Sequence, residues 1–147
     1  MKKGIIIMIA TLFLAVACDT KPTVEKNKKE FETVYAETIK VHDEVMAKMG
    51  TINKLQVQLE EEVKAATDTV PYAEAMKTLK KGHKGMMDWM HSFSDAFPHT
   101  EDRFAGKSKE EIDESVERLK EYKAQMEAVD AQIKEGIDKA EKLLSSN

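Results

Sequence analysis

The sequence predicts an all-α protein: an antiparallel up-down-up bundle of three long helices that follows a cleaved lipoprotein signal peptide. Three observations support this fold class. An apolar segment near the start ends at the only cysteine of the chain. Apolar residues then recur every three or four positions through most of the remaining sequence, and no strand-like alternation of useful length is present. With 147 residues, the chain has room for one modest domain.

The first segment has the pattern of a signal peptide over residues 1–17. Lys2 and Lys3 precede an apolar run over residues 4–17, which as a helix would span roughly 21 Å, short of the ~30 Å hydrocarbon core of a membrane. The small residues just before Cys18 resemble the lipobox of bacterial lipoproteins, although Ala15 stands where that motif usually has leucine. An ordinary secretory signal with a cysteine near its end is the alternative.

The lipobox resemblance implies that Cys18 is lipidated, with acyl chains such as palmitate, and becomes the mature N-terminus. Residues 18–23 would then tether the helical domain, residues 24–147, to a membrane of the bacterial cell envelope, facing the periplasm or the cell surface. Removal of residues 1–17 takes away two lysines and no acidic residue, so the formal charge falls from −4 to −6. An acidic chain without a large basic field does not suggest nucleic-acid binding.

The first helix is predicted over residues 24–66. Its apolar stripe keeps one phase for about forty positions, with these residues spaced by seven: Phe31, Thr38, Val45, Ile52 and Leu59. Gly50 lies inside this stripe without shifting its phase, which favours one continuous helix at a cost near 1 kcal/mol. A break at residues 49–51 is the alternative.

Two further helices follow. Pro71 suits a first helical turn and opens a helix predicted over residues 71–96, which ends before Pro98. A polar loop leads to Ser108 and Glu111, which match the S-x-x-E capping box at the start of a helix over residues 108–144. The unequal helix lengths leave part of the bundle uncovered, so a protein partner or self-association is expected there.

Methionine and histidine gather in two stretches, residues 42–50 and 82–91. If the first two helices are straight and antiparallel, Met90 faces Ala47 and His91 faces Met46, so both stretches meet at one height. Gly50, Gly82 and Gly85 are expected to let these helices approach closely. Thioether sulfur and imidazole together favour Cu(I). The candidate ligands are His42, Met46, Met49, His83, Met86, Met87, Met90 and His91.

Other interpretations of this cluster stay open. Methionine at core positions is ordinary filler, and the cluster could also line a groove for a partner or an apolar ligand. A haem held non-covalently by His and Met is a narrower variant of the metal interpretation. No nucleophile motif or phosphate-binding glycine loop is present in the sequence, which predicts that the protein is not an enzyme.

The stretches HDEVMAKMG (residues 42–50) and MMDWMH (residues 86–91) resemble a group of small helical lipoproteins of the bacterial envelope. Proteins of this group often carry the label "viral A-type inclusion protein", which reflects coiled-coil similarity. The resemblance implies a location and a helical fold, and no activity. We therefore expect a membrane-anchored lipoprotein with a non-catalytic binding role, with soft-metal binding as the first hypothesis and a structural or partner-binding coiled-coil protein as the alternative.

Overall fold

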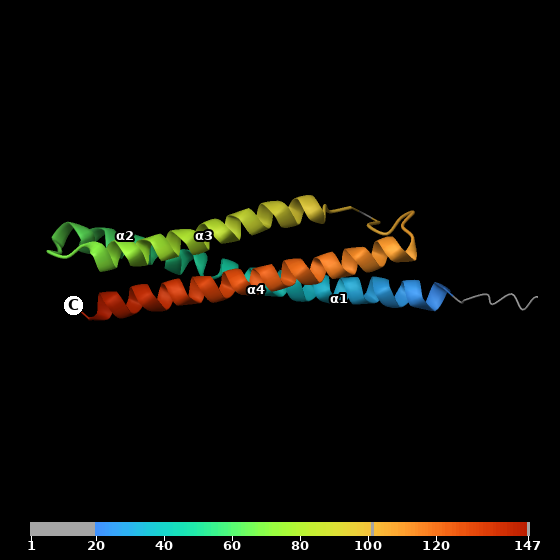
Figure 1. Cartoon of the computed structure of the whole chain (residues 1–147), viewed down its shortest axis with the longest axis horizontal. Coiled ribbons are helices and arrows are strands. Elements are labelled where there is room, and N and C mark those ends of the chain that lie inside the picture. Colours follow the sequence, from blue (N-terminus) through green and yellow to red (C-terminus); the bar gives the residue numbers. More distant parts are fainter. Residues whose placement is uncertain (1–19, 101, 147) are drawn as a thin grey trace, which may run out of the picture.

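A computed structural model describes residues 20–100 and 102–146, and this part of the chain contains helices and no strand. The helices are α1 (Thr20–Met46), α2 (Met49–Ala65), α3 (Val70–Ala96) and α4 (Lys109–Ser145). Helices α1 and α2 follow one another along the long axis of the molecule, and α3 and α4 run along the same axis (Figure 1). The all-α prediction is confirmed for these residues. The predicted signal peptide and Cys18 lie outside them.

The prediction of one continuous helix over residues 24–66 is wrong in one respect. This segment forms a bent rod, in which Ala47 and Lys48 separate α1 from α2. The amide of Ala47 still donates to the Asp43 carbonyl four residues back (3.1 Å), but the amide of Lys48 donates to Val45, three residues back (2.9 Å). This switch tightens one turn and redirects the rod. Gly50 is the second residue of α2, so the break falls two residues before it.

Helix α4 is the common packing partner of the bundle. It packs against α1, α2 and α3, and α2 also packs against α3. In Figure 1, α4 (orange to red) runs alongside both α1 and α3. It buries one apolar stripe, which consists of Ile112, Val116, Leu119, Met126, Ile133 and Ala140. Because its stripe lies against all three other helices, α4 holds the two halves of the bent rod and α3 in one core.

Aromatic side chains fill the space between α1 and α3 near one end of the bundle. Phe31 meets Phe97 edge to face at 5.8 Å between ring centroids, and Tyr35 meets Phe93 at 5.7 Å. Trp89 stacks on Phe93 at 4.5 Å, and its indole N–H donates to the Tyr122 carbonyl of α4 (2.9 Å). A buried indole thus has a polar partner as well as apolar neighbours.

Glycines bring α3 and α4 close together. A Cβ added at Gly82 would lie 2.8 Å from Cγ1 of Ile133, and one at Gly136 would lie 3.3 Å from a Leu79 methyl. The expectation that Gly50, Gly82 and Gly85 draw the first two helices together is therefore wrong. Gly82 and Gly85 face α4, and Gly50 has nothing within 4 Å.

The ends of the later helices follow the sequence signals. Ser108 accepts a hydrogen bond from the Glu111 amide (3.2 Å), and the Glu111 carboxylate accepts one from the Ser108 amide (2.7 Å), which confirms the capping box. Pro71 lies in the first turn of α3, as expected. Among the described helices, none has the length and apolar character needed to span a membrane.

Adding a methyl group should have opposite effects on stability at the closely packed Gly82 and at the open Gly50. Gly82→Ala should destabilise the protein by about 1–3 kcal/mol, because the new methyl overlaps Ile133 in a packed interface. Gly50→Ala should stabilise it by up to about 1 kcal/mol, because this helical position is open and alanine lowers the entropy of the unfolded chain. Urea unfolding followed by circular dichroism measures both. Equal effects of the two substitutions would contradict this account of α3–α4 packing.

Candidate functional site

The first methionine and histidine stretch, residues 42–50, spans the bend between α1 and α2. Met46 is the last residue of α1 and Met49 the first of α2. The Met46 side chain is exposed (41%), whereas His42 and Met49 are half-buried. The three side chains therefore lie close together along the chain but on two differently directed helices. Met46 does not contribute to the core, contrary to the interpretation of these methionines as filler.

The second stretch, residues 82–91, lies wholly on α3, and some of its side chains are buried in the core whereas others are exposed. Met86 is fully buried, and Met90 and His83 are half-buried. Met87 (52% exposed) and His91 face solvent. Met86 is thus ordinary core packing, and only the other members of this stretch have side chains that an ion from solvent can reach.

One direct contact joins the two stretches. The imidazole of His42 stacks on the indole of Trp89, with 5.9 Å between ring centroids. The two stretches therefore meet, but the predicted register is wrong, since a straight antiparallel pair would place Trp89 opposite Lys48. The reason is that α1 packs on α4 and changes direction at Ala47, so it meets α3 at a different height.

The hydrogen bonding of His42 suits a metal ligand. Its Nδ1 lies 2.9 Å from the Asp43 carboxylate, so Nδ1–H donates to that oxygen. The neutral tautomer with the proton on Nδ1 leaves a lone pair on Nε2, which is the arrangement found where a carboxylate orients a metal-binding histidine. No comparable partner is found for His83 or His91 within the described residues.

Hard-metal sites are not found in the same region. Within residues 20–100 and 102–146, no three His, Cys, Asp or Glu side chains converge in a way that could hold an ion. Asp88, which flanks the second stretch, instead accepts a hydrogen bond from Lys84 one turn earlier at 2.5 Å, on the exposed face of α3. A metal bound to this surface would therefore need methionine sulfur among its ligands.

A half-buried cation lies at the bend itself. The Lys48 ammonium reaches across to Asp130 of α4 at 2.5 Å, and Lys134 binds the other oxygen of the same carboxylate at 2.6 Å. Asp130 is buried, with 13% of its side chain exposed. Sequence reasoning missed this group, although its signal was present: Asp130 falls between Met126 and Ile133 on the apolar stripe of α4.

Two opposing effects set the ionisation of Asp130. Burial raises the pKa of this carboxyl, but the hydrogen bonds and positive charges of Lys134 and Lys48 outweigh burial, and the net pKa lies below the ordinary value of 3.8. Asp130 is therefore ionised whenever the protein is near neutral pH. The bend of the rod is thus fastened to α4 by a charged pair that is partly shielded from water.

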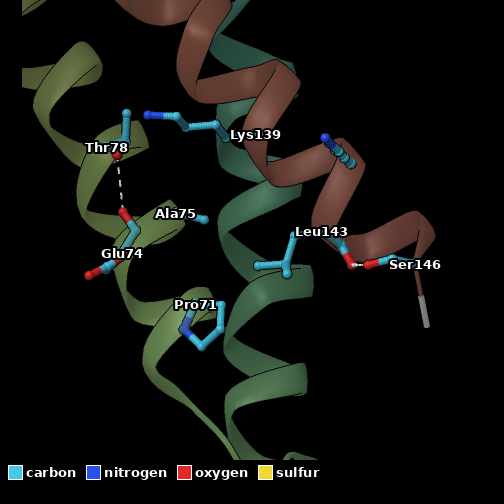
Figure 2. A pocket seen from close by; sticks show the side chains of 8 residues that line it. Pro71, Glu74, Ala75, Thr78, Lys139, Leu143 and Ser146 are labelled. Carbon is cyan, nitrogen blue, oxygen red and sulfur yellow. Dashed lines mark hydrogen bonds between the residues drawn. The ribbon is translucent and has the colours of Figure 1, made fainter.

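A separate groove of about 400 Å³ lies between the start of α3 and the end of α4 (Figure 2). Its lining residues are Pro71, Glu74, Ala75, Thr78, Lys139, Lys142, Leu143 and Ser146. The hydroxyls of Thr78 and Ser146 donate to carbonyls of their own helices, and Lys139 pairs with Glu135 at 2.6 Å. These three polar side chains are thus engaged within the protein.

Comparisons with protein-family models, with curated protein sequences and with solved structures find no match to this chain. The resemblance to small envelope lipoproteins remains an expectation from the residues quoted above.

The Asp130 pair predicts a pH-dependent stability difference. Because the folded pKa of Asp130 is lowered, its contribution is present above the unfolded value of 3.8 and is lost as the pH falls through the folded pKa. At pH 7, Asp130→Asn should therefore cost about 1–3 kcal/mol, since it leaves Lys48 and Lys134 without their anion. The difference from wild type should shrink below about pH 4.

Urea unfolding at a series of pH values measures this dependence. Asp138→Asn is the matched control, because Asp138 is exposed on the same helix. A penalty for Asp130→Asn that stays constant down to pH 2, or one equal to that of the control, would contradict the role assigned to the pair.

Proposed function

We propose that this protein is a lipid-anchored, non-catalytic binding protein of the bacterial cell envelope, and that it binds Cu(I) through its methionine and histidine side chains. The proposal includes lipidation of Cys18 and an antiparallel, up-down-up order of three rods, the first of them bent. The four-residue connection between α2 and α3 and the course of the chain in Figure 1 support that order.

The main observation in support of the metal hypothesis is that the side chains of Met46 and Met87 are exposed. Among the described residues, the large hydrophobic side chains that are exposed are Met46, Val57, Val70 and Met87, and the two methionines belong to the two predicted stretches. Core filling does not explain a thioether in water. Exposed sulfur close to half-buried imidazole suits a soft ion that arrives from solvent.

The accessible members of the cluster define the candidate ligand set. Met86 is excluded because it is fully buried, which leaves His42, Met46, Met49, His83, Met87, Met90 and His91. His42 is favoured among the imidazoles, since Asp43 holds its Nδ1 proton and frees Nε2.

The structural alternative is supported by a different observation. Val57 of α2 is 60% exposed and Val70 at the start of α3 is 61% exposed, both towards the end of the bundle where α2 joins α3. Exposed β-branched side chains on helices are candidates for contact with another helix. A partner-binding coiled-coil protein without metal would use this end and would be indifferent to the Met46 and Met87 side chains.

Anaerobic titration of residues 19–147 with Cu(I), in competition with a chromophoric chelator, tests the metal hypothesis. The double variant Met46→Leu/Met87→Leu should lose at least about tenfold in affinity, because it removes two sulfur ligands while keeping side-chain volume. Met76→Leu, a half-buried methionine of α3 outside both stretches, is the matched control and should bind as wild type does.

Two results would reject Cu(I) binding at this surface. One is wild-type binding no tighter than about 1 μM. The other is an identical affinity of the double variant and wild type, which would assign any bound copper to other groups.

The anchor is tested separately in cells. Cys18→Ser should move the protein from the membrane fraction to the soluble fraction, because the proposal makes the lipid on Cys18 the main attachment. Fractionation with immunoblotting measures this release, and Ser108→Ala is a control that leaves Cys18 intact. Full membrane retention of Cys18→Ser would overturn lipidation as the means of attachment.

A further inference from the structure

The end of the bundle next to the predicted anchor carries three neighbouring lysines that the proposed function does not use. Lys26, Lys28 and Lys29 line an open groove of about 770 Å³ with Glu25, Glu32 and Phe104. Phe104 comes from the connection between α3 and α4 and packs edge to face on Phe31 of α1, at 5.3 Å between centroids. In Figure 1 the beginning of α1 and this connection lie at the same end of the molecule.

The neighbouring carboxylates are mostly occupied within the protein. Glu32 pairs with Arg103 at 3.8 Å, and Glu30 pairs with Lys120 at 2.7 Å. Asp113 accepts hydrogen bonds from Lys109 (2.7 Å) and from the side-chain amide of Asn27. These acids are neutralised by groups other than the three lysines.

The three lysines, in contrast, have no ion pair within the described part of the chain. Lys26 and Lys29 are exposed, and the Lys28 ammonium lies 5.6 Å from the centre of the Phe104 ring. A cation over an aromatic face keeps its charge and its remaining hydrogen-bond donors. Glu25 and Glu32 are the acids that line the groove, and Glu32 is paired with Arg103, so lysines outnumber acids in the lining of this groove on a protein that is acidic as a whole.

The position of these lysines relative to Cys18 indicates their partner. Helix α1 begins at Thr20, two residues after Cys18, and a helix rises about 1.5 Å per residue, so Lys26 and Lys29 lie roughly 9 and 14 Å along it. These distances are about one to two Debye lengths at physiological salt, at the edge of the range in which charges near a membrane surface act. A lipid on Cys18 would place this groove at the headgroup level.

We propose that Lys26, Lys28 and Lys29 form a contact surface for anionic phospholipid headgroups, which seats the anchored end of the bundle on the membrane. This inference rests on the lipid anchor of the proposed function for its orientation. The lysines would strengthen attachment to an anionic bilayer and leave attachment to a neutral bilayer unchanged. Each lysine near such a surface contributes about a fivefold gain in partitioning, so the three together give about 100-fold.

A chemically attached lipid makes the test independent of lipidation in the cell. Cys18 is the only cysteine, so a chain starting at Cys18, which contains every described helix, can be coupled through its thiol to one myristoyl-length chain that binds bilayers weakly and reversibly. Partitioning is then measured on vesicles of phosphatidylcholine alone and of phosphatidylcholine with 30% phosphatidylglycerol. Circular dichroism confirms that each variant is folded.

The expected result is preferential partitioning of the wild-type conjugate onto the anionic vesicles, by about 100-fold at 0.1 M salt and much less at 1 M. Lys26→Gln/Lys28→Gln/Lys29→Gln should abolish most of this preference. The matched control, Lys77→Gln/Lys80→Gln/Lys81→Gln, removes the same charge from three exposed lysines of α3 and should retain it.

Equal partitioning of wild type onto both vesicles would overturn the proposal, and so would equal losses in the two triple variants, which would indicate a general charge effect. Failure of the anchor itself is a distinct outcome: it appears as membrane retention of Cys18→Ser in cells, whereas the vesicle preference is measured with the lipid supplied by chemistry.

Discussion

The apolar stripe of α4 is the constraint on which the rest of the structure depends. It is the one surface shared by α1, α2 and α3, and it is continuous from Ile112 to Ala140 except where Asp130 interrupts it. At that point the rod formed by α1 and α2 changes direction, and Lys48 from the bend binds the interrupting carboxylate. A buried carboxylate on an otherwise apolar stripe needs a cation, so the bend and Asp130 stabilise each other.

Local signals explain most of what the sequence could predict. The boundaries of the second and third predicted helices depend on Pro71, Pro98 and the Ser108–Glu111 capping box, all of which act within a few residues, and they agree closely with α3 and α4. At the bend, Lys48 binds Asp130, which is 82 residues away in the chain. A heptad pattern carries no information about such a contact, and its unbroken phase through Gly50 favoured a straight rod.

In the candidate site, too, the sequence predicted local features and missed those that depend on contacts between helices. Periodicity grouped the methionines and histidines correctly by helix, but it could not separate Met86, which is buried, from Met87, which is exposed, without knowing which face α4 covers.

The predicted facing pairs of residues were wrong because they assumed that the first helix packs directly on the second. The rings of Phe31, Tyr35, Phe93 and Phe97 instead fill the space between α1 and α3, and the two stretches meet through His42 and Trp89. Along α1, His42 lies roughly 33 Å from Thr20, so the methionine and histidine stretches lie well along the bundle from the lysines at the start of α1.

The central functional claim concerns which methionine sulfurs meet a metal ion, and methyl NMR observes these groups one by one. Protein labelled with ¹³C at the methionine methyl groups would be titrated anaerobically with Cu(I). The account predicts that the Met46 and Met87 signals shift, with Met49 or Met90, while those of Met76 and of buried Met126 stay in place. No shift at any methionine, or equal shifts at all of them, would contradict it and leave a helical bundle without a copper site.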